Sequence, residues 1–146
     1  AALGGGAELP TVADWVVAGE SAEIGFVHAA LGVSPGWGGG GRLLRRIGRS
    51  RATEVLLTAR RYRGEAALRV GLVDAGVAEG QAVQAARDWL AKITRNPAES
   101  IRGMIEIIRS ADRGPEALAL AEREVFERLW GSPDHLAALQ SLDAGQ

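Results

Sequence analysis

Three consecutive glycines followed closely by a glutamate form the first segment of the sequence that could carry chemistry. Gly4, Gly5 and Gly6 precede Glu8 where a short helix is expected to begin. Glycines at a helix start let a ligand approach the backbone closely, and the free N–H groups there attract negative charge. Such a turn could hold a phosphate or the developing oxyanion of a thioester enolate. The spacing matches neither the phosphate-binding loop nor the dinucleotide fingerprint.

The position of Glu8 allows two interpretations. A carboxylate in the first turn of a helix can accept hydrogen bonds from free backbone N–H groups and so cap them. It can also act as a general acid or base. The cap is the more common role for such a residue, and the motif alone leaves both open.

His28 and Trp37 are the other candidates for a functional site. His28 ends the apolar stretch 24–27, just before a glycine-rich loop that contains Trp37. A histidine on an apolar segment is more often a core residue than a catalyst, but strand ends beside loops commonly carry functional side chains. Trp37 suits either a pocket wall or a loop anchor. His135 is expected at the surface or at an interface, and these spacings build no metal site.

The elements that must position these residues are short in the first half of the chain and helical in the second. Short apolar runs predict buried strands, and Leu, Ile and Val at helical spacing predict helices. The predicted strands cover residues 15–18, 23–27 and 72–75, and the predicted early helices cover 7–14, 42–47, 51–59 and 65–70. Gly48 is a predicted helix stop. From Gly80 onward the pattern predicts helices alone.

The composition excludes several classes of protein and site. The chain has 146 residues, with 17 Lys+Arg against 18 Asp+Glu and a formal net charge of -1. This balance gives no electrostatic footprint for nucleic acid or an anionic membrane. The lack of cysteine excludes disulfides and Cys-based metal sites. Because no apolar run approaches the ~20 residues of a membrane span, we expect a soluble, cytoplasmic protein.

Several segments follow one another in an order typical of one known family. They are Ala2-Leu3-Gly4-Gly5-Gly6-Ala7-Glu8-Leu9, Ala13-Asp14, Leu31-Gly32-Val33-Ser34-Pro35-Gly36-Trp37-Gly38-Gly39, Arg42-Leu43, Ile47-Gly48, Ala66, Leu68 and Gly71-Leu72-Val73. Together they resemble the crotonase (enoyl-CoA hydratase/isomerase) superfamily. The resemblance implies an α/β fold, in which a crotonase-like spiral of ββα turns precedes a helical region that builds trimers.

The resemblance also implies an organisation of the chain. We expect residues 1–79 to form the C-terminal part of the spiral core and residues 80–146 to form the helical oligomerisation region. The chain opens abruptly in a glycine turn, without a strand or loop long enough to position it. We therefore expect this sequence to be the later part of a longer fold, with the N-terminal half of the family's core missing.

Particular residues acquire roles from the same resemblance. Gly5 supplies one N–H group of the oxyanion hole, and Glu8 matches the first of two catalytic glutamates in the family's hydratases. His28 stands where the second glutamate is expected, so the chain departs from the hydratase pattern. The substrate pocket is expected to include Gly4, Phe26, Gly36 and Trp37.

An imidazole in place of the second carboxylate favours decarboxylation. The segments Phe26-Val27-His28, Pro35-Gly36-Trp37-Gly38-Gly39 and Leu129-Trp130-Gly131-Ser132-Pro133 are similar to the branch that decarboxylates ethylmalonyl-CoA and methylmalonyl-CoA. Loss of carbon dioxide leaves an enolate that backbone N–H groups stabilise, and no water has to be activated. His28 would hold the substrate carboxylate or protonate the α-carbon. Glu8 would face a carboxylate, so we expect a raised pKa and a proton-donor role.

The predicted function is therefore that of an acyl-CoA lyase in fatty acid metabolism, with coenzyme A as part of the substrate and no other cofactor. One alternative is an enoyl-CoA hydratase or isomerase with an unusual catalytic pair. Another is an incomplete, non-catalytic crotonase half that acts as an assembly partner. The resemblance also implies a homotrimer or a dimer of trimers, and the apolar helical faces after Gly80 fit such an assembly.

Overall fold

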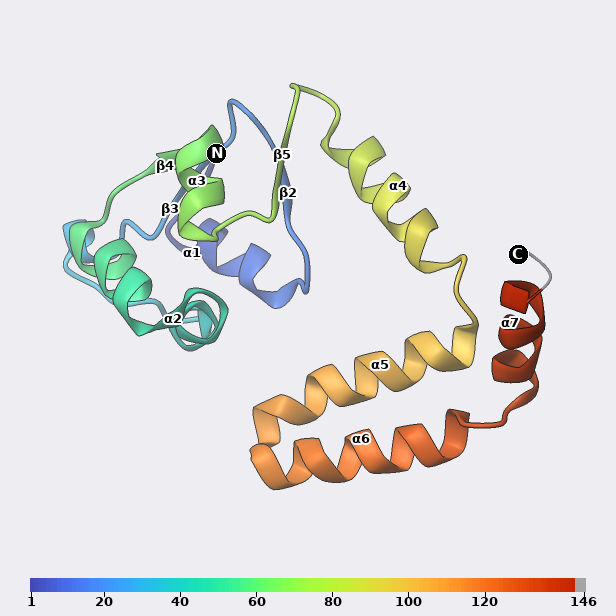
Figure 1. Ribbon diagram of the computed structural model, residues 1–146. Helices are drawn as coiled ribbons and strands as arrows, with labels where there is room; N and C mark the ends of the chain where they lie inside the picture. Colours follow the sequence, from blue (N-terminus) through green and yellow to red (C-terminus); the bar gives the residue numbers. More distant parts are fainter. Residues whose placement is uncertain (144–146) are drawn as a thin grey trace. The chain divides into compact units, whose positions relative to one another are not determined.

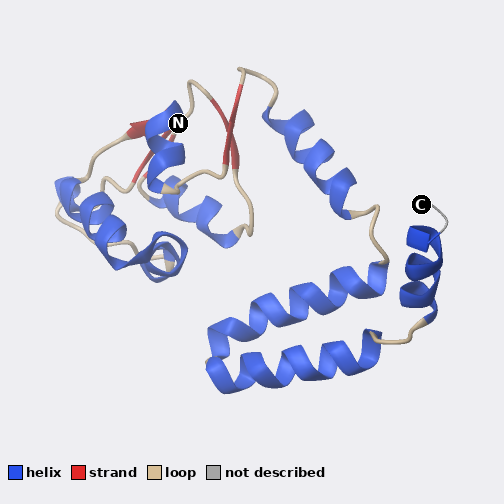
Figure 2. Ribbon diagram, in the orientation of Figure 1, coloured by secondary structure: helices blue, strands red, loops and turns tan. Residues whose placement is uncertain are grey.

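The computed structural model describes residues 1–143 and divides into two compact units (Figure 1). The first unit spans Ala1–Arg87, and the second begins at Asp88. The division falls inside α4 (Ala82–Ile93), whereas the sequence changes character at Gly80. Residues 144–146 of the predicted helical region lie outside the described residues. Short strands and helices alternate in the first unit, and the described part of the second is built from helices and their connections (Figure 2).

Two small sheets organise the first unit. β1 (Ala2–Leu3) pairs in parallel with β3 (Glu23–Gly25), and β3 pairs antiparallel with β4 (Tyr62–Arg63). In the other sheet, β2 (Val17–Gly19) runs parallel to β5 (Ala75–Val77). Parallel neighbours need crossover connections, which here include the helices between the paired strands. This alternation confirms the predicted α/β class.

The helices of the first unit include one long segment that breaks at a glycine. α1 (Gly5–Glu8) continues into the 3-10 helix η1 (Leu9–Val12), and the later helices are η2 (Ala29–Leu31), α2 (Gly39–Thr58) and α3 (Gly64–Val70). Within α2, Gly48 has φ 75° and ψ 165°, which no helix accommodates. A positive φ favours glycine. The predicted helix stop at Gly48 is therefore confirmed.

Three strands of the first unit differ from the prediction, and one of them is β4, whose two residues no pattern indicated. Leu72 and Val73 are buried, as their apolar character suggests, but they lie in a turn whose N–H groups bond back to the carbonyl of Ala67. Pairing with β2 begins only at Ala75. An apolar run indicates burial without distinguishing a strand from a turn, so the predicted strand at 72–75 is wrong in position. β1 was not predicted because two residues are too few to show a pattern.

Almost every element of the first unit contributes to one hydrophobic core. Its buried members are Ala7, Ile24, Phe26, Leu43, Ile47, Ala52, Val55, Tyr62, Ala67, Val70, Leu72 and Val73. Phe26, Leu43 and Val55 are completely enclosed. Burial of an aliphatic or aromatic side chain contributes about 1.5–3 kcal/mol, so these three residues anchor β3 and both halves of α2.

The second unit is built around a pair of helices. After α4 come α5 (Ala98–Ser110), η3 (Ala111–Arg113), α6 (Pro115–Leu129) and α7 (Pro133–Asp143). α5 and α6 lie side by side, joined by η3 (Figure 1). A Cβ on Gly103 would lie 2.5 Å from Cγ1 of Val125, so the missing side chain lets the helices approach closely. None of the described helices combines the length and the apolar character needed to cross a membrane.

Candidate active site

Two parallel strands bring the glycine turn and His28 to the same edge of a sheet. β1 ends at Leu3 and leads into Gly4, while β3 ends at Gly25 and leads through Phe26 to His28. The N–H of Gly4 donates to the carbonyl of Gly25 at 3.0 Å. Because the carboxyl ends of neighbouring parallel strands face the same edge, the segments that follow them lie close together.

Glycine is required at both positions of the turn that starts α1. Gly4 has φ 57° and ψ -127°, a conformation that side chains disfavour. A Cβ on Gly5 would lie 2.7 Å from Cζ3 of Trp37, so the indole ring packs directly against the Gly5 backbone. Gly5 is the first residue of α1, and its N–H therefore has no acceptor within the helix.

The Glu8 carboxylate is buried and contacts four donor groups. Oε2 accepts hydrogen bonds from the N–H groups of Trp37 at 2.9 Å and Gly39 at 2.8 Å. Oε1 accepts from the N–H of Gly36 at 3.2 Å and lies 3.2 Å from Nε2 of His28. Because Gly39 begins α2, Glu8 closes the N-terminus of α2, whereas the sequence suggested a cap on its own short helix.

These contacts lower the pKa of Glu8. Burial acts in the opposite direction, but the N–H groups of Gly39, Trp37 and Gly36 and the charge of His28 outweigh it and hold the pKa below 4.5. In the protein without substrate the pKa of Glu8 is therefore lowered, which is opposite to the shift expected beside a substrate carboxylate, and the carboxyl group is ionised at neutral pH. The sequence did not reveal this because the backbone donors come from a distant loop.

His28 is held on one side by Glu8, and its other ring nitrogen has no partner. The ring centroid lies 5.9 Å from that of Phe26. The carbonyl of His28 accepts from the N–H groups of Leu31 at 2.9 Å and Val33 at 3.1 Å, which fixes its main chain at the start of η2. The side chain is 9% exposed. Nδ1 is buried without a hydrogen-bond partner among the described residues, which is uncommon for a buried polar atom.

Thr11 and Arg42 support the loop that contacts Glu8, and the sequence analysis assigned them no role. Arg42 donates to the carbonyl of Trp37 at 2.8 Å through Nη2 and to Oγ1 of Thr11 at 2.9 Å through Nε. Oγ1 of Thr11 donates in turn to the carbonyl of Glu8 at 2.6 Å. Arg42 belongs to the segments that carry the family resemblance, a signal that could have found it. Thr11 has no such signal.

The remaining predicted pocket residues divide into two groups. Gly4, Gly36 and Trp37 lie beside Gly5 or Glu8, and the Trp37 side chain is largely exposed. Phe26 is 0% exposed and belongs to the hydrophobic core. The expectation that Phe26 lines the pocket is corrected accordingly: its ring supports His28 from within the core.

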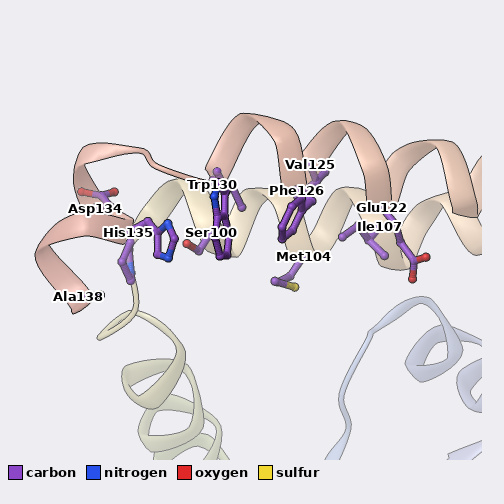
Figure 3. Close-up of a pocket in the computed structure, with 12 residues that line it drawn as sticks. Ser100, Met104, Ile107, Glu122, Val125, Phe126, Trp130, Asp134, His135 and Ala138 are labelled. Carbon is purple, nitrogen blue, oxygen red and sulfur yellow. The ribbon is translucent and has the colours of Figure 1, made fainter. Parts of the chain in front are cut away.

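The second unit contains a cavity of its own, with a volume of about 380 Å³ (Figure 3). It is lined by Pro97, Ser100, Met104, Ile107, Glu122, Val125, Phe126, Leu129, Trp130, Asp134, His135 and Ala138. Phe126 and Trp130 stack with centroids 5.1 Å apart, and the His135 ring lies 4.7 Å from that of Trp130. Nδ1 of His135 accepts from the N–H of Gly131 at 2.9 Å. Residues 1–143 contain no group of three or more His, Asp or Glu side chains that could hold a metal ion.

Comparison with known proteins agrees with this geometry. The sequence pattern described as enoyl-CoA hydratase/isomerase matches residues 1–141. The chain belongs to the enoyl-CoA hydratase/isomerase family. The resemblance stated from the glycine segments, Glu8 and the later GLV segment is thereby confirmed.

Curated relatives of this crotonase-family chain include ethylmalonyl-CoA decarboxylases. The enzyme of Gallus gallus is 39% identical over 142 residues, which are 94% of this chain and 48% of the relative. The enzyme of Rattus norvegicus is 38% identical over 142 residues, again 94% of this chain and 48% of the relative. The chain therefore spans about half the length of the curated relatives it matches, and it corresponds to their C-terminal part.

Solved structures of the family confirm the crotonase-like fold. Enoyl-CoA hydratase from Bacillus anthracis matches with a TM-score of 0.89 and 32% identity, covering 99% of this chain and 57% of that structure. Pseudomonas aeruginosa DspI matches with a TM-score of 0.87 and 31% identity, covering 99% of this chain and 56% of that structure. Both similarities extend over 99% of this chain and so include both of its units.

Proposed function

We propose that the protein, at its full natural length, is an acyl-CoA lyase that decarboxylates 2-alkylmalonyl-CoA thioesters. The relatives named ethylmalonyl-CoA decarboxylase support this substrate class. The observation that carries the proposal is the pairing of Glu8 with His28, in which both carboxylate oxygens are occupied and Nδ1 is left without a partner. Such a pair suits a reaction that needs a cationic or proton-donating imidazole and no activated water.

The reaction proceeds through an enolate. The bond between the α-carbon and the carboxylate breaks, carbon dioxide leaves, and the electron pair moves into the thioester carbonyl. The N–H of Gly5, which has no acceptor within α1, stabilises the enolate oxygen. The α-carbon then takes up one proton and the thioester carbonyl re-forms. In the proposed site His28 binds the departing carboxylate or delivers this proton.

The surroundings of Gly5 provide the rest of the pocket. The indole of Trp37 covers one side of Gly5 and remains largely exposed, so it offers an apolar wall to the acyl group. Gly4 and Gly36 border the same turn and loop, where the absence of side chains leaves room for a thioester. Coenzyme A enters as part of the substrate, and the proposed reaction needs no further cofactor.

Hydration of an enoyl thioester is the second candidate, favoured by the similarity to a structure named enoyl-CoA hydratase. Hydration requires a group that activates water and a group that delivers a proton. Glu8 already accepts three backbone hydrogen bonds and is ionised. His28 would have to perform both tasks, which makes decarboxylation the better match.

An assembly of several copies accompanies the proposed function. Among the described residues of α5 and α6, Met104, Ile108, Leu120 and Phe126 are exposed apolar side chains. Patches of this kind mark interaction surfaces in soluble proteins. We propose that they contribute to the homotrimer, or dimer of trimers, that the family resemblance implies.

The experiment offers the full-length protein a mixture of ethylmalonyl-CoA, methylmalonyl-CoA and crotonyl-CoA, and follows the thioester masses over time. Loss of carbon dioxide from the malonyl thioesters, abolished in His28→Gln, is the expected result. Gain of water on crotonyl-CoA alone would identify a hydratase instead. No change in any thioester would favour the assembly partner.

A further inference from the structure

The contact between the carboxylate of Glu8 and the imidazole of His28 influences which ring nitrogen carries the hydrogen. An ionised carboxylate can only accept hydrogen bonds. Nε2 of His28 lies 3.2 Å from Oε1 of Glu8, and a bare lone pair on Nε2 would face that negative oxygen, so the contact favours the neutral tautomer with its hydrogen on Nε2. The other nitrogen, Nδ1, is then a bare acceptor in the neutral ring and becomes the donor when the ring takes up a second proton.

Glu8 cannot easily turn away from this contact. Its oxygens also accept from the N–H groups of Gly36, Trp37 and Gly39, and a Cβ on Gly39 would lie 2.4 Å from Cγ of Glu8. The side chain of Glu8 is 2% exposed. The loop therefore holds the carboxylate, and the carboxylate holds the orientation of the His28 ring.

We infer that Glu8 is a positioning residue: it fixes the tautomer of His28, so that Nδ1 is the ring atom that meets the substrate and protonates the α-carbon. This step rests on the proposed decarboxylation. The N–H bond at Nδ1 breaks and a C–H bond forms at the enolate α-carbon, whose electron pair came from the departing carboxylate. His28 is left neutral with its hydrogen on Nε2, facing Glu8, and Nδ1 regains a proton from solvent.

Replacing Glu8 by Gln reverses this arrangement. The amide oxygen takes the place of Oε2 and keeps the N–H groups of Trp37 and Gly39, so the amide NH₂ lies opposite Nε2 of His28 and the longer hydrogen bond from the N–H of Gly36 is lost. Nε2 must then accept a hydrogen bond, so the neutral ring carries its hydrogen on Nδ1. Proton transfer from Nδ1 would now leave two donors facing each other. We expect kcat to fall by about 10²-fold, within the range of a lost acid–base contribution, with KM nearly unchanged.

The test measures the tautomer and the activity separately, in the full-length protein labelled with ¹⁵N-histidine. Ring ¹⁵N–¹H correlation spectra at a pH where imidazole is neutral report which nitrogen of His28 carries the hydrogen. The signals are identified by their loss in His28→Gln and His135→Gln. His135, whose Nδ1 accepts from the N–H of Gly131, is the internal control and keeps its hydrogen on Nε2 in every variant.

We expect hydrogen on Nε2 of His28 in the wild type and on Nδ1 in Glu8→Gln. The control variant is Glu23→Gln, which alters a carboxylate paired with Arg63. It should change neither the tautomer of His28 nor kcat. Hydrogen on Nδ1 in the wild type would overturn the inference, even if Glu8→Gln failed to fold. A folded Glu8→Gln with an unchanged tautomer or an unchanged kcat would also overturn it. Wild-type protein that releases no carbon dioxide would instead refute the proposed function, and the spectra would still decide the tautomer.

Discussion

The two units of the chain differ in how far they bury their apolar side chains. Among the described residues, every buried hydrophobic side chain except Ala121 and Val125 lies in the first unit. The first unit also encloses Glu8 and His28 within this core. The second unit has regular helices, yet large apolar side chains such as Ile108 and Phe126 are exposed. The first unit therefore encloses the proposed catalytic pair, and the second exposes apolar surface.

This difference shows what helical amphipathicity does and does not establish. A stripe of apolar residues predicts that one face of a helix is covered. In the first unit, α2 buries such residues in the core shared with β3 and α3. In the second unit, α5 and α6 cover only part of theirs by packing on each other. The same pattern thus accompanies a closed core in one unit and an available surface in the other.

The largest expected effect compares the two histidines of the chain, one in each unit. His28→Gln should lower the rate of carbon dioxide release from ethylmalonyl-CoA by more than 10²-fold, because the acid–base group is lost. His135→Gln should leave that rate within about threefold, because the proposed reaction uses no side chain of the second unit. Mass spectrometry of the thioesters at fixed times measures both rates. An equal loss of rate in the two variants would contradict the proposal that His28 takes part in the reaction and His135 does not.

A second prediction tests how tightly the first unit is packed around Glu8. In Gly39→Ala the new Cβ would lie 2.4 Å from Cγ of Glu8, so either the loop or the carboxylate must move. We expect a loss of about 1–3 kcal/mol in the free energy of unfolding, as for overpacked cores. Urea unfolding monitored by circular dichroism measures it.

The matched control for this variant lies two positions further along the same helix. A Cβ on Gly41 meets no atom within 4 Å, and alanine is a better helix former than glycine. Gly41→Ala should therefore keep or slightly raise the free energy of unfolding. Destabilisation of the same size in both variants would show that the effect comes from the helix end and not from Glu8.

A third prediction follows from the lowered pKa of Glu8. A carboxyl group whose pKa is lower in the folded protein stabilises it fully above the ordinary value of 4.5, and that stabilisation is lost as the pH falls through the folded value. The free energy of unfolding should therefore decrease on acidification below that pH. In Glu8→Gln this contribution is absent, so the decrease should be shallower. Urea unfolding at a series of pH values tests the prediction, and parallel curves would contradict it.

The smallest expected effect concerns the second unit. Ile108 is 63% exposed, so Ile108→Gln should change the free energy of unfolding of a single chain by no more than about 0.5 kcal/mol. If other copies cover this surface, the variant should nevertheless weaken their association. Light scattering after size exclusion measures the mass of the assembly, with Arg109→Gln as the control on the same helix. An unchanged assembly would place the interface elsewhere.

The sequence predicted the residue types of the site better than their physical state. Gly5, Glu8 and His28 became candidates because glycines and polar residues interrupt apolar segments, a local signal, and the family resemblance then implied their roles. The ionisation of Glu8 depends on the N–H groups of Trp37 and Gly39, which approach only in the folded chain. No local pattern contains that information.

The position of Phe26 could not be predicted from the sequence either. The family resemblance implied that it lines the substrate pocket, whereas its aromatic ring is completely buried in the core. The helices after Gly80 and the stop at Gly48 could be predicted because spacing and backbone freedom are properties of consecutive residues. The turn at Leu72 and Val73 could not, because pairing with β2 decides where β5 begins.

The cap that Glu8 places on α2 has a consequence for the order of folding. Gly48 divides α2 into segments 39–47 and 49–58, each shorter than the ~12 residues that an isolated helix needs in water. The first segment also lacks a side-chain cap from its own N-cap residue, Gly38. We therefore expect this half of α2 to become stable only when β1 and β3 have paired and brought Glu8 to Gly39. Formation of the Glu8–His28 pair and completion of the helix would then be one cooperative step.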